Sequence, residues 1–460
     1  MSGSLPHPYY QYCDLGPVPR RSPAPTPGAL DMLHRVQAYR GHPVQQLGFI
    51  TASTTFDAKE NLDRLLLILT QPPMFTTLRV DLSKISAREA QHEIMISLKE
   101  QSMKTGLETF SMFWHAEFQD CLVLHNRGPN TVEKVDKEMM VDLACGMAVL
   151  RGAHVFVQGI MAAPPGKKLF IGNGVSQVSR SDVFNAYSRS VRGVGVLMTQ
   201  PVFEAPCLAE LSFPWLVPQN LPSIACVHAL APQPGELVLD MCAAPGGKTS
   251  HIAALMANQG KIVALEKSSE RAKKLEQLGL QNVHVFAYDA TKALSQDLVP
   301  QAERVFGPPF PPSSFDRILV DAPCSALGQR PCYVNRISVN QLMSFPVIQH
   351  KLLMVAAELL RPGGVLVYST CTITLAENEE QVAKFLARRA DMKLVAPSVR
   401  LGSCGLEGSQ LDATQRAMVQ RYDPGMLLAD RDSRPSQDLH NVDTIGFFIA
   451  KFVKHKEEDT

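Results

Sequence analysis

The 460-residue sequence lacks several patterns that mark common protein classes. None of its ten cysteines stands in Cys-x-x-Cys spacing, which argues against a zinc ribbon or a thioredoxin-like site. No apolar run approaches the ~18 residues that a membrane span needs; the longest covers only residues 65–69. The amino terminus has no cationic segment followed by an apolar one, so we expect no secretory signal. We therefore expect a cytoplasmic protein with reduced thiols and no membrane partner.

The chain also lacks an excess of charge of either sign. Lys plus Arg total 45 and Asp plus Glu total 44, a balance that excludes a basic nucleic-acid coat over the whole surface. Basic residues are nevertheless concentrated in residues 151–200, where six stand against the single acid Asp182. They are Arg151, Lys167, Lys168, Arg180, Arg189 and Arg192. This cluster predicts either a solvated basic face or a surface that contacts RNA phosphates.

The first 200 residues divide by composition. Prolines at 6, 8, 17, 19, 23, 25 and 27 predict an extended, disordered tail over about residues 1–45. Leucines at 62, 65, 66 and 69 have helical spacing, residues 75–80 are strand-like, and residues 88–101 read as an amphipathic helix. We therefore predict a small α/β unit over residues 46–110. Residues 111–200 carry short apolar runs separated by glycines, which predicts a small β module.

From residue 235 onward, short apolar strands alternate with helical stretches. The predicted strands cover residues 236–241, 261–266, 283–286, 315–321, 365–369 and 445–453, and the predicted helices cover residues 251–256, 268–278, 339–360 and 376–388. This alternation is typical of a parallel sheet that is covered by helices on both faces. Ligands of such sheets bind beyond the carboxyl ends of the strands, so the residues that follow each strand are the candidate site.

The first of these strands leads into a glycine-rich turn, Cys242-Ala-Ala-Pro-Gly-Gly-Lys248. A phosphate loop requires glycine at position 242, where this chain has cysteine, and the G-x-G-x-x-G dinucleotide fingerprint is absent. A doubly wound oxidoreductase is therefore disfavoured. The interpretation that remains is a turn that binds a nucleoside lacking a pyrophosphate.

Acidic residues follow the next two strands. Glu266 is placed to accept hydrogen bonds from both ribose hydroxyls, and Asp289 is placed to bind an adenine amino group. Together with the glycine-rich turn, these acids predict S-adenosyl-L-methionine as the cofactor.

Cysteines follow two further strands, in Asp321-Ala-Pro-Cys324 and Ser369-Thr-Cys371. Each could be an ordinary core cysteine, but parallel-strand geometry places both thiols at the cofactor edge. A thiolate that adds to C6 of cytosine makes C5 nucleophilic enough to accept a methyl group. An acid near the base would stabilise the charge that develops at N3, and a second cysteine could assist release of the product.

These strings resemble the motifs of the Sun-domain RNA cytosine-5 methyltransferases. The resemblance covers residues 200–455 closely and implies a Rossmann-like class I methyltransferase sheet. It assigns Cys371 as the nucleophile and Cys324 as the residue that promotes release, with Asp321 and Lys248 supporting catalysis. It assigns the cofactor site to Cys242, Ala243, Ala244, Pro245, Gly246, Gly247, Lys248, Glu266, Asp289 and Asp321. The family usually has Asp where this chain has Glu266.

Two further strings, Arg151-Gly-Ala-His-Val and Phe170-Ile-Gly-Asn-Gly-Val175, resemble a PUA domain, which is an RNA-binding β-barrel. The resemblance therefore divides the chain into a tail (1–45), an amino-terminal α/β extension (46–110), an inserted PUA-like domain (111–200) and the methyltransferase domain (201–456). It points to the family branch that methylates tRNA acceptor ends, and we expect a monomer without metal whose partner is tRNA. The segment between Gly159 and Leu169 is short for such a barrel, so the PUA-like domain is abbreviated. The alternative hypothesis is therefore an RNA-binding homologue with impaired catalysis.

Overall fold

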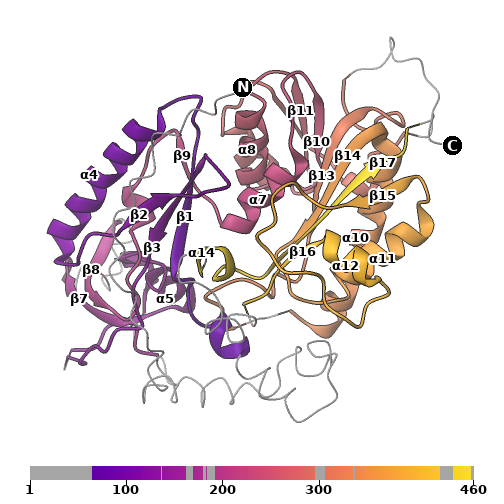
Figure 1. Ribbon diagram of the computed structural model, residues 1–460. Coiled ribbons are helices and arrows are strands. Elements are labelled where there is room, and N and C mark those ends of the chain that lie inside the picture. The colour runs from indigo at the N-terminus through magenta and orange to yellow at the C-terminus, as the bar shows by residue number, and fades with distance from the viewer. Residues whose placement is uncertain are drawn as a thin grey trace, which may run out of the picture.

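The computed structural model describes residues 65–135, 137–161, 169–179, 183, 192–295, 306–334, 337–424 and 439–456. In Figure 1 the amino-terminal elements form one lobe and the elements after residue 236 form most of the other. The predicted disordered tail lies outside the described residues. So does most of the leucine-rich helix, of which residues 65–69 are described as helical.

The larger lobe contains an eight-stranded sheet with the order β12-β11-β10-β13-β14-β17-β15, in which β16 also pairs with β17. Its strands are β10 (Leu237–Asp240), β11 (Lys261–Glu266), β12 (Val283–Ala287), β13 (Phe315–Asp321), β14 (Leu360–Thr370), β15 (Met392–Val395), β16 (Gln420–Tyr422) and β17 (Phe447–Lys454). Strands β10 to β14 pair in parallel, which confirms the predicted parallel sheet for five strands. The last predicted strand, β17, instead runs antiparallel to β14, β15 and β16. A strand that is buried on both faces has the same apolar pattern in either direction, so its sequence did not reveal this orientation.

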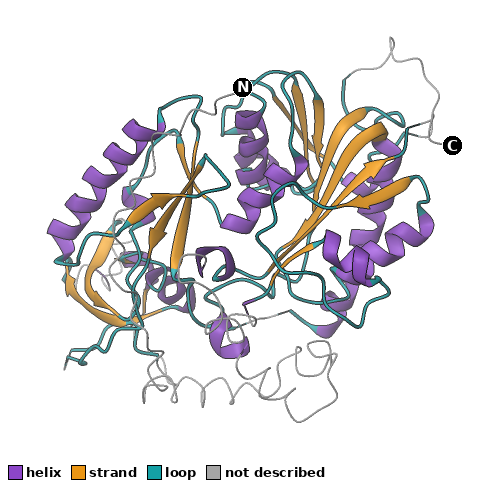
Figure 2. Ribbon diagram, viewed as in Figure 1, coloured by secondary structure: helices purple, strands orange, loops and turns teal. Residues whose placement is uncertain are grey.

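Helices cover both faces of this sheet (Figure 2). They are α7 (Leu221–Leu230), α8 (Gly247–Leu255), α9 (Ser269–Glu276), α10 (Val339–Leu359) and α11 (Glu379–Arg388). Alternate strand residues face the two layers: Val238 packs in the core that contains α7 and α8, and Leu239 in the core that contains α10 and α11. Two shorter helices, α12 (Ala413–Met418) and α14 (Leu439–Val442), lie in the connections to β16 and β17.

Helix α10 is long and apolar enough to cross a membrane when only its length and composition are considered. Its side chains Leu352, Leu353, Ala356 and Ala357 are instead buried in the core of the sheet. Packing against β13 and β14 therefore accounts for the apolar character of the second half of this helix, whereas Val339, Met343, Val347 and Ile348 in its first half are exposed.

The amino-terminal unit is a four-stranded antiparallel sheet with the order β2-β3-β1-β9, covered on one face by α4. Its elements are β1 (Phe75–Val80), α4 (Ala87–Thr105), β2 (Met112–Trp114), β3 (Cys121–His125) and β9 (Leu216–Pro218). Helix α4 begins at a reciprocal capping box, in which Ser86 and Glu89 each bind the other's backbone amide. Leu122 and Leu124 of β3 pack against α4, whereas Val123 packs in the core that contains α7. The unit is thus fixed to the larger lobe by a shared core.

The small β module is inserted between β3 and β9. It comprises β4 (Met140–Val141), α5 (Leu143–Val149), β5 (Val155–Phe156), β6 (Ile160–Met161), β7 (Gly172–Ser176) and β8 (Val194–Pro201), arranged as a β4-β6 pair and a β5-β8-β7 sheet. The sequence placed a domain boundary between residues 110 and 111. In the structure, β2 and β3 lie after this boundary but pair within the sheet of β1, so they belong to the amino-terminal unit. Short strands look alike in sequence, and only their long-range pairing assigns them to one sheet or the other. Of the predicted basic cluster, only Arg151 and Arg192 lie within the described residues.

Candidate active site

The predicted site residues lie at one edge of the larger sheet. Asp240, Glu266 and Asp321 are the last residues of β10, β11 and β13, and Ser369 pairs with Asp321 near the end of β14. These strands are parallel, so their carboxyl ends bring residues from distant parts of the chain together.

Cys324 and Cys371 converge at this edge, as their positions after neighbouring strands predicted. Their Sγ atoms lie 3.4 Å apart, and both side chains are partly exposed. The hydrogen bond with Cys324 lowers the pKa of Cys371, with further support from Gln329 and Lys248. The same contact raises the pKa of Cys324 well above its usual value. When one of the two thiols ionises, this contact therefore favours the thiolate on Cys371, with Cys324 as the hydrogen-bond donor.

Lys248 and Asp321 form an ion pair beside the two thiols. Lys248 Nζ lies 2.8 Å from Asp321 Oδ2, and Ser369 Oγ donates to Asp321 Oδ1 at 2.8 Å. Burial opposes the charge of Lys248, but Asp321, Cys226 and Cys371 together outweigh it and raise the pKa of the ammonium group above its usual value. The ammonium group also lies over the ring of Phe447, 5.2 Å from its centroid.

Sequence reasoning missed Glu377, which joins the two cysteine-bearing loops. Its carboxylate accepts from the backbone amide of Ser325 at 2.9 Å and from the Ser325 hydroxyl at 2.6 Å. Thr374 and Gln349 donate to the same carboxylate at 2.9 and 3.0 Å. Glu377 is only 1% exposed, so these bonds replace its hydration. The sequence did offer one signal for this residue, because Glu377 is the first charged residue after Cys371 and follows a stretch of apolar and hydroxyl side chains.

The glycine-rich turn passes from β10 into α8. Gly246 has φ +106°, and a Cβ at this position would collide with the side chains of Leu275 and Leu278. Glycine is therefore required for both conformation and space.

Asp240, at the start of this turn, was not among the predicted site residues. Its Oδ2 accepts from Thr249 Oγ1 at 2.8 Å, whereas Oδ1 has no partner among the described residues. Burial raises the pKa of Asp240 to about 7. An orphaned buried carboxyl oxygen beside the predicted cofactor turn fits the cationic part of S-adenosyl-L-methionine.

Glu266 and Asp289 lie farther along the same edge. Glu266 accepts from the backbone amide of Ser268 and lies 3.5 Å from Arg271, which also donates to the carbonyl of Ala244 in the turn. Asp289 accepts from Thr291 and pairs with Lys267 at 3.0 Å. Arg271 thus links Glu266 to the glycine-rich turn, while Asp289 caps a short 3-10 helix.

A cavity of about 450 Å³ lies between the sheet edge and the amino-terminal unit. The methyltransferase side contributes Asp240, Cys242, Ala243, Ala244, Pro245, Gly247, Lys248, Asp321, Gln329 and Arg330. The facing wall includes Thr76, Asn126, Arg151, Gln219, Asn220 and Ser223. This volume is ample for a nucleoside-sized ligand. The cavity therefore joins the catalytic edge to elements of both amino-terminal modules.

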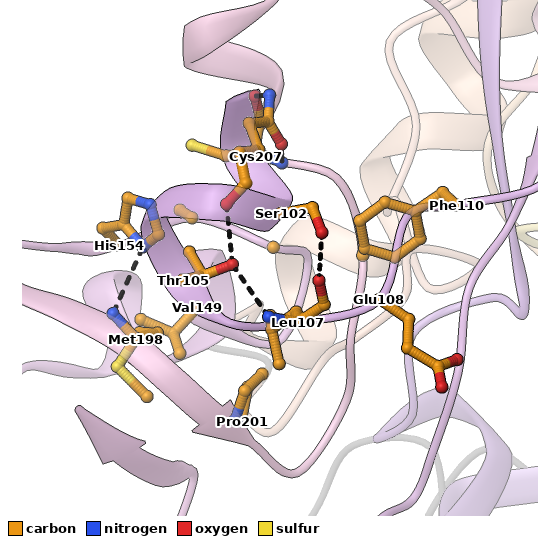
Figure 3. A pocket seen from close by; sticks show the side chains of 14 residues that line it. Ser102, Thr105, Leu107, Glu108, Phe110, Val149, His154, Met198, Pro201 and Cys207 are labelled. Atoms are coloured by element: carbon orange, nitrogen blue, oxygen red, sulfur yellow. Dashed lines mark hydrogen bonds between the residues drawn. The ribbon is translucent and has the colours of Figure 1, made fainter. Parts of the chain in front are cut away.

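Figure 3 shows a second hollow, between α4 and the small β module. It has only about 20 Å³ of free space, which suits a water molecule rather than an organic ligand. His154 accepts there from the Met198 amide through Nδ1, and its Nε2 faces Glu210 at 3.7 Å. An imidazole that accepts through Nδ1 carries its proton on Nε2, so the N–H of His154 faces the Glu210 carboxylate.

Asp120, His228 and His251 form another cluster, between the two lobes. Both histidines bind the Asp120 carboxylate through Nε2, at 2.8 and 2.7 Å. Burial opposes ionisation of Asp120, but these bonds lower its pKa below the usual range. Burial lowers the pKa of His251 to about 4, so this histidine is neutral where it binds the buried carboxylate. The cluster joins the turn before β3 to α7 and α8.

The fold is that of a Rossmann-like methyltransferase, and its sheet edge carries two thiols in contact. A sequence family described as 16S rRNA methyltransferase RsmB/F matches residues 227–453. The tRNA (cytosine(72)-C(5))-methyltransferase NSUN6 of Mus musculus is 41% identical over 445 residues, covering 88% of this chain and 92% of that protein. The NSUN6 of Homo sapiens is 40% identical over 447 residues, covering 88% and 94%.

A crystal structure of NSun6 from Pyrococcus horikoshii, determined with SFG, has a TM-score of 0.67 and 30% identity, covering 87% of this chain and 96% of that chain. The chain therefore belongs to the Sun-domain family of RNA cytosine-C5 methyltransferases. SFG is an analogue of S-adenosyl-L-methionine, the methyl donor of this family. The family resemblance and the cofactor class predicted from the sequence are confirmed.

Proposed function

We propose that this protein methylates C5 of a cytosine at the acceptor end of tRNA, with Cys371 as nucleophile and Cys324 as the residue that assists release. The observation that carries the proposal is the 3.4 Å contact between these thiols beside the Lys248–Asp321 pair. The choice of tRNA is supported by the mouse, human and archaeal relatives, which are named for cytosine 72 of tRNA.

Cys371 is suited to the attack because the contact with Cys324 lowers the pKa of its thiol and so favours the thiolate. Formation of the Sγ–C6 bond moves an electron pair toward N3 and makes C5 nucleophilic. S-adenosyl-L-methionine supplies the methyl group that C5 takes up. Loss of the C5 proton then allows the C6–Sγ bond to break, and Cys324 is the nearest group to the departing sulfur.

Asp321 and Lys248 are suited to hold the base. The Lys248 and Ser369 contacts keep a carboxylate and an ammonium group fixed at the cavity wall. The carboxylate can accept from the exocyclic amino group of cytosine, and the ammonium can stabilise negative charge on the ring. Both groups are only partly exposed, with Lys248 at 14% and Asp321 at 29%, which strengthens their electrostatic effect.

For the cofactor, we propose the turn from Cys242 to Lys248 with Glu266 and Asp289. Glu266 is linked to the turn through Arg271, which places a carboxylate near the predicted ribose position. The partnerless oxygen of Asp240 adds an acceptor at the same edge.

We assign RNA docking to the small β module in its PUA-like role. The cavity supports this assignment, because Arg151 of the module and Lys248 of the catalytic edge line it together. The described strands of the module form a β4-β6 pair and a separate β5-β8-β7 sheet, which do not join into one closed barrel among the described residues. A homologue with impaired catalysis that still binds RNA is therefore the second candidate.

Methyl transfer to tRNA transcripts tests the proposal directly. We expect wild-type protein to incorporate labelled methyl into a transcript with cytosine at position 72, and not into one with uracil there. Cys324→Ala should accumulate a protein–RNA adduct that survives denaturing gels, whereas Cys371→Ala should form none. The double variant is the matched control for non-specific cross-linking. Normal turnover by Cys371→Ala would refute the mechanism, and cofactor binding without turnover by wild type would favour the second candidate.

A further inference from the structure

The two active-site thiols lie on neighbouring chain segments with matched geometry. Asp321 of β13 pairs with Ser369 of β14, so Cys324 and Cys371 follow strands that lie side by side. Both cysteines lie just beyond the strand ends, where the loops that follow bring their sulfur atoms into contact. The Sγ atoms, 3.4 Å apart, need to approach by little more than 1 Å to reach bonding distance.

The remaining cysteines differ in access. Cys121, Cys207 and Cys226 are buried, and burial raises the pKa of each of these thiols. Cys404 is exposed but has only the Arg400 guanidinium against its sulfur. Cys145, Cys242 and Cys332 are partly exposed, but burial raises the pKa of each. Among the described residues, Cys324 and Cys371 are the pair that combines partial exposure, contact between two thiols and, at Cys371, a lowered pKa. This combination is typical of cysteines that respond to oxidants.

We propose that Cys324 and Cys371 form a reversible disulfide when the protein meets a hydroperoxide, and that this bond switches the methyltransferase off. In the first step the Cys371 thiolate attacks the peroxide and forms a sulfenic acid as the O–O bond breaks; hydroxide leaves from hydrogen peroxide, and alkoxide leaves from an alkyl hydroperoxide. In the second step the Cys324 sulfur attacks the Cys371 sulfur, its thiol proton is released, and hydroxide departs to form water. The two thiols lose two electrons and two protons, and the peroxide is reduced to water or alcohol. A dithiol reductant reverses the change by thiol–disulfide exchange.

The loss of activity rests on the proposed function, because it requires Cys371 to be the nucleophile. The formation of the bond does not, because it depends only on the two sulfur atoms. The cofactor turn and Glu266 lie on other strands, so binding of S-adenosyl-L-methionine should persist in the oxidised protein.

The experiment uses the full chain carrying Cys404→Ser, which removes an exposed thiol outside the site. The protein is treated with hydrogen peroxide, quenched, and analysed by intact mass and by peptide mapping without reductant. We expect loss of two hydrogen atoms, a peptide pair joined through Cys324 and Cys371, and recovery of the starting mass with dithiothreitol. Methylation of tRNA should fall and recover in parallel.

Cys324→Ser in the same background distinguishes a resolving role from general oxidation. Without its partner, Cys371 should progress to a sulfinic acid that dithiothreitol does not reverse. Stepwise gain of oxygen by the protein with both cysteines, or bridges that join other cysteines, would overturn the proposal. If the bond forms but wild type shows no methylation under reducing conditions, the proposed function fails while the redox assignment stands.

Discussion

The carboxylate of Glu377 accepts two hydrogen bonds from Ser325, 52 residues earlier in the chain. Ser325 follows Cys324 directly, and Glu377 lies in the loop that begins at Cys371. The contact therefore holds the two cysteine-bearing loops together, although neither Ser325 nor Glu377 is itself one of the reacting groups.

Replacing Glu377 by Ala should loosen both loops and lower stability. The substitution removes the acceptor of the Ser325 amide and of Thr374, at roughly 1–3 kcal/mol for each unpaired group. The Ser325 hydroxyl and Gln349 each lose one of two partners, since Thr372 and the Pro323 carbonyl remain. We expect a loss of about 3 kcal/mol in urea unfolding and at least a tenfold fall in kcat, with a smaller effect for Glu377→Gln. Glu380→Ala is the matched control, because its pair with Lys384 is exposed. Equal stability of the two Ala variants would show that Glu377 does not hold the loops.

Lys248→Met should reduce catalysis more than it reduces cofactor binding. The variant keeps an unbranched chain but leaves Asp321 without its cation and removes the positive charge beside the base. Removal of one preorganised electrostatic contact costs about 100-fold or more in kcat. Single-turnover methylation and calorimetry with the cofactor measure the two effects separately. Lys267→Met, whose Asp289 pair is largely exposed, is the comparison; similar losses in both would contradict a role for Lys248 at the base.

Local sequence was sufficient for several elements. The strands over residues 75–80, 261–266 and 315–321 have the predicted bounds, because β-branched, aromatic and aliphatic residues favour strands. Cys324 and Cys371 were predicted to meet because parallel strands end at one edge.

Other features depend on pairing that no local pattern encodes. The sequence did not reveal that β2 and β3 join β1, or that β17 enters the sheet antiparallel between β14 and β15. Glu377 was missed because its role arises only when two loops 52 residues apart meet. Asp240 was missed because its orphaned oxygen is a result of burial, not of residue type.

The stability of the cofactor-free protein should depend on pH through Asp240. Burial raises the pKa of this carboxyl from about 4 to about 7, so the folded state holds a proton that the unfolded state has lost. Its stabilising contribution is full below pH 4 and is lost as the pH rises to about 7. Other groups titrate in the same range, so the measured quantity is the difference in unfolding free energy between wild type and Asp240→Asn. We expect this difference to shift against wild type between pH 5 and pH 8; a constant difference would show that Asp240 is not perturbed.

Arg330 and Asp443 should prove essential for joining the amino-terminal segment to the catalytic lobe. Arg330 Nη1 lies 2.5 Å from Asp443 Oδ1, the side chains are 3% and 4% exposed, and Arg330 also donates to the carbonyl of Ile68. Asp443 in turn accepts from the backbone amide of Met74. Removal of one partner leaves a buried charge, so Arg330→Met should cost about 3–5 kcal/mol in chemical denaturation.

Pairing Arg330→Met with Asp443→Leu separates the uncompensated charge from the loss of packing. The double variant should be more stable than Arg330→Met alone, because no buried carboxylate remains without a cation. Arg416→Met is the control, since its partner Glu407 is largely exposed and the pair should contribute less than about 1 kcal/mol. If Arg330→Met were no more harmful than Arg416→Met, the contacts of Arg330 would not anchor residues 68–74. Because Arg330 also lines the cavity, its anchoring role further predicts that KM for RNA rises in the single variant even where the protein remains folded.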